Sequence, residues 1–289
     1  MRIDIELLRI VSAVGIVWFH SNNSTGREVA YGGLVFFVII STYFATVSRS
    51  TNKFKSRFKR LIIPYIIWSL LYAVLNFVGT GQICPHRQNL VSCILGTPST
   101  HLWYLPYMFG VLFILDKIKS ASSKSKMGTV SGILAIALIL LAPLWRSQTY
   151  LSPFELYLHA LPAVLYGVFL GCYDRINQKL RLFILSVISA SVLVMIYVLP
   201  QGIGIPYLCG FLPSLLLIRE DVLQKTKIDI YPISSLMYGV YLLHFAFFLV
   251  FWSLGINYYW LPVAVFLLSL FSVFAIKKML PAKIHKYLI

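Results

Sequence analysis

The sequence predicts an all-α polytopic membrane protein: one bundle of about ten transmembrane helices formed by residues 1–289, with both chain ends in the cytoplasm. First, 59% of the residues are hydrophobic and 12% are charged, whereas soluble domains carry about 25% charge. Second, the apolar runs approach the ~20 residues that cross a bilayer, and they lack the alternation of barrel strands. Third, basic residues recur in every second connection. Because backbone groups in hydrocarbon need partners within the chain, these runs predict helices.

The expected spans are, in chain order, 5–20, 29–47, 61–79, 101–116, 127–145, 154–173, 181–200, 202–218, 233–254 and 258–276. The first, fourth and eighth are short. Asp4, Glu6 and Arg9 interrupt the first, and no small-residue cleavage site follows it, so we interpret it as a helix and not as a signal peptide. The eighth contains Pro206 and Pro213, which predict a kink or a partly re-entrant path.

The basic residues predict the orientation, because Lys and Arg accumulate in cytoplasmic loops. Of the 25 basic residues, 21 lie at position 2 and in segments 49–60, 117–126, 175–181, 219–227 and 277–286, which share one side. The opposite connections hold only Arg27, Arg87 and Arg146. This topology also explains the net charge of +16. A spread over many loops does not favour nucleic-acid binding, and anionic lipid head groups are the expected partners.

The four cysteines fall into two pairs with different expectations. Cys84 and Cys93 share the outer loop between the third and fourth spans, so an oxidising compartment would allow a disulfide, with two free thiols as the alternative. Cys172 and Cys209 lie near helix ends and are interpreted as small packing residues. No spacing suggests a metal site.

Two polar residues lie within the first span. Arg9 and His20 are eleven positions apart, which returns them to within about 20° of one helix face and separates them by about 16 Å along the axis. An arginine inside a span normally faces a cavity or a partner, and Glu6 is suited to pair with it. In one interpretation Arg9 reaches the head groups and His20 caps the helix. In the other, His20 is a general base, because imidazole gains and loses its proton near neutral pH.

A basic run precedes the third span. It includes Lys53, Arg57 and Arg60, and the two arginines share one helical face. Ordinary cytoplasmic charge explains this run. The alternative is a phosphate clamp, for which arginine has a suitable bidentate geometry.

Further polar residues stand near the outer face. His101 and Trp103 open the fourth span, where aromatic residues commonly anchor a helix at the interface. Tyr241 and His244 lie three apart on the ninth span, where a hydrogen-bonded structural histidine is the simpler interpretation. Glu155 is the notable carboxylate on this side, and its distance from His20 stays open.

These residues, in this order, resemble the acyltransferase 3 family of membrane acyltransferases over nearly the whole chain. Arg9, ten residues and then His20, with Glu6 ahead, resemble the family's Arg-x10-His signature. The segments similar to its other motifs are 36–41, Arg57-x-x-Arg60 before Pro64-Tyr65, His101-Leu-Trp-Tyr, and Ser235 through Tyr241 to His244. Thr42 is a departure, because the family often has glycine after the serine.

The resemblance implies a multi-pass O-acyltransferase, most simply an O-acetyltransferase, of the bacterial cytoplasmic (inner) membrane. It implies acetyl-CoA (an acyl-CoA) as cytoplasmic donor, and no permanently bound cofactor or metal. The implied acceptor is a hydroxyl of a cell-surface or lipid-linked glycan, such as an exopolysaccharide or O-antigen.

The resemblance also implies roles for individual residues. It implies that His20 is catalytic, with Arg9 as its companion in the membrane, and that Lys53, Arg57 and Arg60 lie near the CoA phosphates. The residues expected to support the active site are Glu6, Ser41, His101, Trp103, Tyr241 and His244. Of these, Trp103 and Ser41 are the candidates for stabilising an oxyanion.

A transporter or flippase of a lipid-linked saccharide is the main alternative, because it would also need polar residues within its helices. A structural or sensory membrane protein is a third reading, disfavoured by Arg9 and His20 inside a span. Binding of acetyl-CoA separates the acyltransferase from both.

Overall fold

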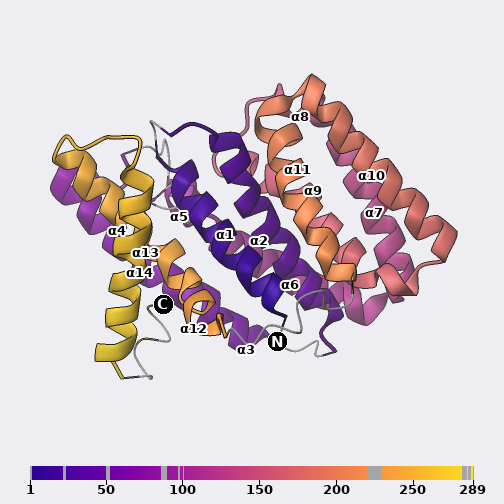
Figure 1. The fold of residues 1–289 in the computed structure, drawn as a ribbon, viewed down its shortest axis with the longest axis horizontal. Helices are drawn as coiled ribbons and strands as arrows, with labels where there is room; N and C mark the ends of the chain where they lie inside the picture. The colour runs from indigo at the N-terminus through magenta and orange to yellow at the C-terminus, as the bar shows by residue number, and fades with distance from the viewer. Residues whose placement is uncertain are drawn as a thin grey trace.

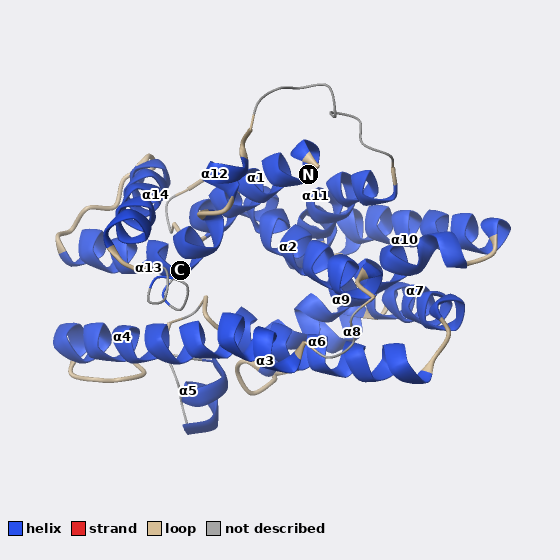
Figure 2. Ribbon diagram, turned by 90° about the horizontal axis from the view of Figure 1, so that it is seen from below, coloured by secondary structure: helices blue, strands red, loops and turns tan. Residues whose placement is uncertain are grey.

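The computed structural model describes residues 2–21, 24–49, 53–85, 90–96, 98–99, 101–219, 229–281, 285 and 288. In this part of the chain every regular element is a helix, as Figures 1 and 2 show, so the all-helical prediction is confirmed there. The basic residues of the loop-charge argument that lie outside the described residues are Arg87, Lys225, Lys227, Lys283 and Lys286.

The elements follow one another along the chain without a break between domains. In order they are α1 (Ile3–Phe19), α2 (Arg27–Val47), α3 (Phe54–Arg57), η1 (Phe58–Ile62), α4 (Ile63–Thr80), α5 (Leu90–Gly96), α6 (Tyr104–Ala121), α7 (Lys124–Leu140), α8 (Ala142–Arg146), α9 (Phe154–Cys172), η2 (Tyr173–Arg175), α10 (Gln178–Val198), η3 (Pro200–Gly204), α11 (Ile205–Ser214), η4 (Leu215–Ile218), α12 (Tyr231–Ser234), α13 (Met237–Ser253) and α14 (Leu261–Met279).

Six helical stretches among the described residues are long and apolar enough to cross a membrane: Arg27–Val47, Phe54–Thr80, Phe154–Arg175, Gln178–Val198, Pro200–Ile218 and Leu261–Met279. Helices α1, α6, α7 and α13 have 17 or 18 residues each and match the other four expected spans in position. Of these, α13 is a shorter apolar helix. The chain is therefore a multi-pass membrane protein, and the full number of crossings remains a prediction.

Helix α2 lies at the centre of the bundle and packs against α1, α9 and α11 (Figure 1). Glycines allow the helices to approach one another closely. A Cβ at Gly33 would lie 2.5 Å from the carbonyl oxygen of Ser12 on α1. A Cβ at Gly167 of α9 would lie 2.5 Å from the carbonyl oxygen of Ile39. Small residues at such crossings are typical of helix packing in membranes, where close van der Waals contact replaces the hydrophobic effect.

Thr42, the departure from the family pattern, fits this packing. Its side chain is fully buried, and its hydroxyl donates to the carbonyl oxygens of Val38 and Ile39 at 3.0 Å each. Gly167 lies directly against that hydroxyl, and a Cβ there would clash with it. The small residue at this contact is therefore Gly167 on α9 and not residue 42 on α2, and the two helices still pack closely.

The eighth expected span shows its irregular backbone at its start and not at the prolines from which a kink was expected. Gln201 and Gly202 have non-helical backbone angles inside η3, and Gly202 has φ of 85°. Pro206 stands in the first turn of α11, where it fits a helix, and Pro213 precedes the 3-10 turn η4.

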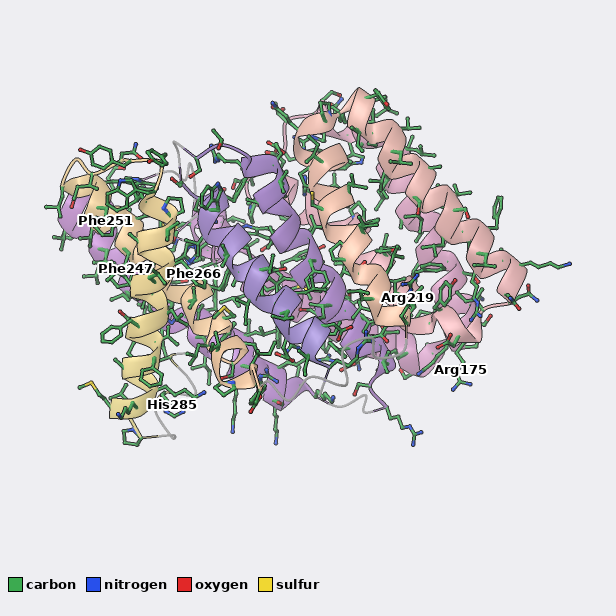
Figure 3. All side chains as sticks on the ribbon, in the orientation of Figure 1. Arg175, Arg219, Phe247, Phe251, Phe266 and His285 are labelled. Carbon is green, nitrogen blue, oxygen red and sulfur yellow. A yellow bond between two sulfur atoms is a disulfide. The ribbon has the colours of Figure 1, made fainter. Side chains whose placement is uncertain are left out.

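Several of the segments rich in basic residues meet at one end of the bundle. Arg2 donates to the carbonyl oxygen of Arg219 at 3.1 Å, and Lys119 donates to that of Ser48 at 2.6 Å. Figure 3 shows Arg175 and Arg219 toward the lower end of the molecule, where the N-terminus also lies in Figure 1. This grouping on one end is what the positive-inside argument expects, and the orientation in the membrane stays a prediction.

Candidate active site

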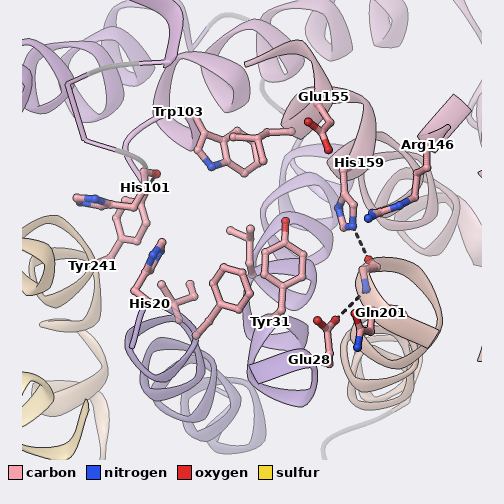
Figure 4. A pocket seen from close by; sticks show the side chains of 15 residues that line it. His20, Glu28, Tyr31, His101, Trp103, Arg146, Glu155, His159, Gln201 and Tyr241 are labelled. Carbon is pink, nitrogen blue, oxygen red and sulfur yellow. Dashed lines mark hydrogen bonds between the residues drawn. The ribbon is translucent and has the colours of Figure 1, made fainter. Parts of the chain in front are cut away.

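A cavity of about 520 Å³ lies at the end of α1 opposite Arg2 (Figure 4). Elements far apart in the chain converge on it. Its lining consists of Ile16, Phe19, His20, Glu28, Tyr31, Leu34, His101, Trp103, Arg146, Glu155, Leu156, His159, Gln201, Gly202 and Tyr241. Its volume is within the ~300–1,000 Å³ that is common for small-molecule sites.

Three histidines from three segments cluster at one end of this cavity, where His20 and His101 line it and His244 lies fully buried beside them. His20 is the C-cap residue of α1, His101 precedes α6, and His244 lies in α13. The ring centroids of His20 and His244 are 5.3 Å apart, those of His101 and His244 4.8 Å, and those of His20 and His101 6.1 Å. The sequence pattern singled out each of these residues, and the fold brings them together.

Hydrogen bonds fix the protonation pattern of two of the three rings. Nδ1 of His244 lies 2.8 Å from the carbonyl oxygen of Tyr241. Since a carbonyl oxygen only accepts, Nδ1 carries the proton and Nε2 of the neutral ring has a free lone pair. In His101, Nε2 faces the carbonyl oxygen of Leu242 at 3.4 Å, and Nδ1 is 2.8 Å from the Ser99 hydroxyl, from which it accepts.

The His244 Nε2 atom is buried and has no hydrogen-bond partner among the described residues. The His244 side chain itself has no exposed surface. A buried acceptor without a partner is costly in a folded protein and needs an explanation. It belongs to the cluster with the His20 ring, whose nitrogens form no hydrogen bond within the described part of the chain.

Tyr241 and Trp103 complete this end of the cavity. The Tyr241 hydroxyl donates to the carbonyl oxygen of His101, which joins α13 to the segment before α6. The Trp103 indole packs beside Tyr157 with ring centroids 5.9 Å apart and borders the cavity, as Figure 4 shows. Ser41, the other oxyanion candidate, lies outside the lining and bonds Tyr104 Oη at 3.0 Å.

Arg9 lies outside the cavity lining, and its side chain is 35% exposed. Its guanidinium forms an ion pair with Glu6 at 2.8 Å, as the spacing predicted. The second carboxylate oxygen of Glu6 accepts from the Ser234 hydroxyl on α12. This network ties the first turns of α1 to α12, at the opposite end of α1 from His20.

The other end of the cavity carries charged residues. Arg146 at the end of α8, Glu155 and His159 on α9, and Glu28 on α2 all border it (Figure 4). The sequence pattern singles out Glu155 but does not place it. It counts Arg146 only among the loop charges and assigns no role to His159 and Glu28. Their one sequence signal is polarity near the ends of spans, which gives no indication that three separate helices converge.

Gly202 organises this charged end. Its N–H donates to Glu28 Oε2 at 2.8 Å, and His159 Nε2 donates to its carbonyl oxygen. The Arg146 guanidinium lies directly over Gly202, where a Cβ would clash with it. A glycine is therefore needed here for two reasons: its positive φ and the arginine that lies against it.

The predicted phosphate-binding residues lie in the basic segment around α3. Arg57 binds Asp116 of α6 through both terminal nitrogens, at 2.6 and 3.1 Å, and donates to the carbonyl oxygen of Leu112. Lys53 donates to the Ser48 hydroxyl at 2.7 Å. Arg60 is exposed. Arg57 therefore already has an acidic partner, and no sequence pattern relates Asp116 to Arg57.

Cys84 and Cys93 form a disulfide, with Cα atoms 6.0 Å apart. Of the two alternatives, the bridge is the one in the structure. Cys172 is buried against Gly128, and Cys209 packs against Gly32. Their interpretation as packing residues is confirmed.

Comparison with known proteins gives one match. Neither the curated proteins nor the solved structures contain a match to this chain. Residues 2–277 match the family model described as the acyltransferase domain. This range includes all of the cavity and the basic segment. The chain therefore belongs to the acyltransferase 3 family.

Proposed function

We propose that this membrane acyltransferase moves an acetyl group from cytoplasmic acetyl-CoA to a hydroxyl of a cell-surface or lipid-linked glycan, with His20 as the general base. The observation that carries the proposal is the position of His20. It borders a cavity large enough for a sugar residue and lies within a cluster of three imidazoles.

In the proposed reaction, neutral His20 takes the proton of the acceptor hydroxyl while the hydroxyl oxygen attacks the thioester carbonyl. The carbon–sulfur bond then breaks, and the CoA thiolate receives that proton from His20. The products are the acetate ester and CoA with a free thiol, and the imidazole returns to its neutral form. General-base catalysis of this kind typically contributes about 10²–10⁴-fold.

His244 is proposed to orient His20. The unpartnered Nε2 lone pair of His244 would accept the N–H of His20, which leaves the other His20 nitrogen free to take a proton. The ring centroids are 5.3 Å apart, so a rotation that brings two ring nitrogens face to face would place them about 3 Å apart, within hydrogen-bond distance. In other general-base sites a carboxylate often has this orienting role.

The indole N–H of Trp103 is the preferred oxyanion donor in this mechanism. Trp103 borders the same cavity as His20, whereas Ser41 does not. An indole N–H can only donate, which suits a carbonyl oxygen that gains negative charge in the transition state.

A line of hydroxyl side chains leads from the cavity toward the basic segment, and we assign the donor arm to this route. Tyr241 borders the cavity, and its ring lies 5.9 Å from that of Tyr104. The Tyr104 hydroxyl is 3.0 Å from the Ser41 hydroxyl. Tyr238, one turn before Tyr241, donates to the carbonyl oxygen of Arg60 at 2.8 Å.

The CoA phosphates are proposed to bind at Lys53, Arg57 and Arg60. Arg60 is exposed and has the fork geometry that phosphate binding favours. Arg57 would either exchange Asp116 for a phosphate or keep that partner and hold α3 in place. Arg9 lies in the first half of α1, whereas His20 caps its C-terminal end. We therefore assign Arg9 to the donor side and not to the transfer step at His20.

The test uses the full chain in lipid nanodiscs with radiolabelled acetyl-CoA. His20→Ala should lower transfer to an acceptor glycan at least 100-fold and leave acetyl-CoA binding within about twofold. His285→Gln is the matched control, because His285 lies outside the cavity. Transfer that persists in His20→Ala would remove the catalytic assignment. Absence of acetyl-CoA binding by the wild-type protein would favour the flippase.

A further inference from the structure

The end of the cavity away from the three histidines has a composition of its own. It is formed by Glu28 and Tyr31 on α2, Arg146 on α8, Glu155 on α9, and Gln201 on η3. These residues lie on four segments of the chain, and Figure 4 shows them around one side of the cavity. Convergence of polar groups from separate segments on one concave surface is typical of a ligand site.

The backbone at this end is held in a defined shape. The Gly202 N–H donates to Glu28, and the Gly202 carbonyl oxygen accepts from His159. Both backbone polar groups of Gly202 therefore have side-chain partners. His159 is 6% exposed and stacks edge-on to Tyr31 with centroids 5.2 Å apart. The Arg146 guanidinium lies against this segment at Gly202.

The charges at this end are mixed and nearly balanced. It holds one guanidinium, of Arg146, and two carboxylates, of Glu28 and Glu155. This differs from the chain as a whole, which has a net charge of +16. Two carboxylates beside one guanidinium disfavour a phosphate or carboxylate ligand, because like charges would face each other in a partly enclosed space. Uncharged groups that both donate and accept suit this set.

Hydroxyl groups are uncharged and both donate and accept hydrogen bonds. Each sugar hydroxyl can donate to a Glu155 oxygen and accept from the Arg146 guanidinium or the Gln201 amide. The cavity also offers aromatic surface from Tyr31, Phe19 and Trp103. A pyranose has apolar C–H faces that can pack on such rings, while its hydroxyls reach the charged groups at the edge.

From this arrangement we infer that the charged end is the acceptor subsite and that it takes an uncharged sugar residue. The inference rests on the proposed function. The sugar would lie between the Arg146–Glu155 end and the histidine cluster, with one hydroxyl directed to His20. The subsite selects the acceptor by its hydroxyls, and an acidic sugar would place its carboxylate beside Glu28 and Glu155.

The test measures acetyl transfer to two panels of simple glycosides by the full chain in nanodiscs. One panel contains methyl glucoside, galactoside and mannoside, and the other contains the corresponding methyl uronosides, which differ by one carboxylate. At least one neutral glycoside should be acetylated with kcat/KM at least tenfold above that of its uronoside. Transfer that favours a uronoside, or failure to acetylate or bind any neutral glycoside, would overturn the inference.

Two variants test the residues. Arg146→Gln and Glu155→Gln should each raise the KM for the best neutral glycoside about tenfold, with the KM for acetyl-CoA changed less than twofold. Arg175→Gln and Asp174→Asn are matched controls, because both residues lie outside the cavity. Unchanged acceptor KM in both cavity variants would overturn the subsite.

The His20→Ala variant shows whether a negative result concerns the acceptor subsite or the proposed function itself. If transfer by the wild type depends on His20 while the acceptor panel contradicts the neutral-sugar subsite, the inference alone fails. If acetyl-CoA does not bind or transfer does not depend on His20, the proposed function fails.

Discussion

The imidazole rings of His20 and His244 lie with their centroids 5.3 Å apart, and the Nε2 atom of His244 is buried without a hydrogen-bond partner in the described structure. They come from the last turn of α1 and from α13, more than two hundred residues along the chain. The bond from His244 Nδ1 to the Tyr241 carbonyl leaves Nε2 as an acceptor. This geometry supports the proposal that His244 orients His20.

Substituting His244 tests this arrangement. His244→Phe removes the acceptor but keeps a ring of similar size in a fully buried position. We expect kcat to fall about 10–100-fold with little change in either KM, the size of effect that orienting partners have in metal sites.

The conservative variant distinguishes orientation from packing. His244→Gln restores an acceptor oxygen, so it should recover part of the kcat lost in His244→Phe. Thermal melting of each variant in nanodiscs serves as the folding control. Equal activity of His244→Phe and wild type would contradict the orienting role, as would equal loss in both variants at unchanged melting temperature.

Gly202→Ala should weaken acceptor binding. Its new methyl group would displace the Arg146 guanidinium, and the residue would also be strained at φ of 85°. Gly255→Ala is the matched control, because Gly255 has φ of 72° and open space around its Cβ position. We expect a higher acceptor KM for Gly202→Ala alone, measured with the best neutral glycoside. A similar KM for the two variants would show that Arg146 is not needed at that position.

The ion pair of Arg57 and Asp116 predicts different effects for neighbouring arginines. Both side chains of the pair are 11% exposed, so Arg57→Ala leaves a largely buried carboxylate unpaired, at a cost of about 1–3 kcal/mol. Arg60 is exposed. Arg60→Ala should therefore raise the KM for acetyl-CoA without lowering the melting temperature.

The double variant Arg57→Ala with Asp116→Ala provides the control, because it leaves no unpaired charge. It should be more stable than Arg57→Ala alone. If the double variant is the less stable one, the pair does not have the structural role assigned to it.

The disulfide offers a test of the topology. Cys84 and Cys93 should react with a membrane-impermeant maleimide on intact cells only after reduction, because their loop is expected on the outer side. Cys172 is buried and should stay unlabelled. Labelling of Cys84 only after the cells are opened would reverse the orientation of the bundle. The Cys84→Ser, Cys93→Ser double variant controls for reaction at other sites.

The sequence predicted the helical class and the candidate histidines, because apolar length and unusual polar residues are properties of single segments. The sequence did not predict which distant residues are neighbours in the folded chain. Asp116 pairs with Arg57 across 59 residues, and no periodicity relates the two. Arg146 and Glu28 meet the same glycine only because η3 turns back at Gly202. Hydropathy shows which face avoids lipid, but it does not show which helix covers that face.

In helix α1 the number of residues matters as well as the face on which each side chain lies. Its first turns are anchored to α12 through Glu6 and Ser234, and its last turn ends at His20 in the cavity. One residue inserted between Arg9 and His20 would rotate the imidazole by about 100° and shift it by about 1.5 Å. This stretch of chain should therefore accept changes of apolar side chain far more readily than any change in the number of its residues.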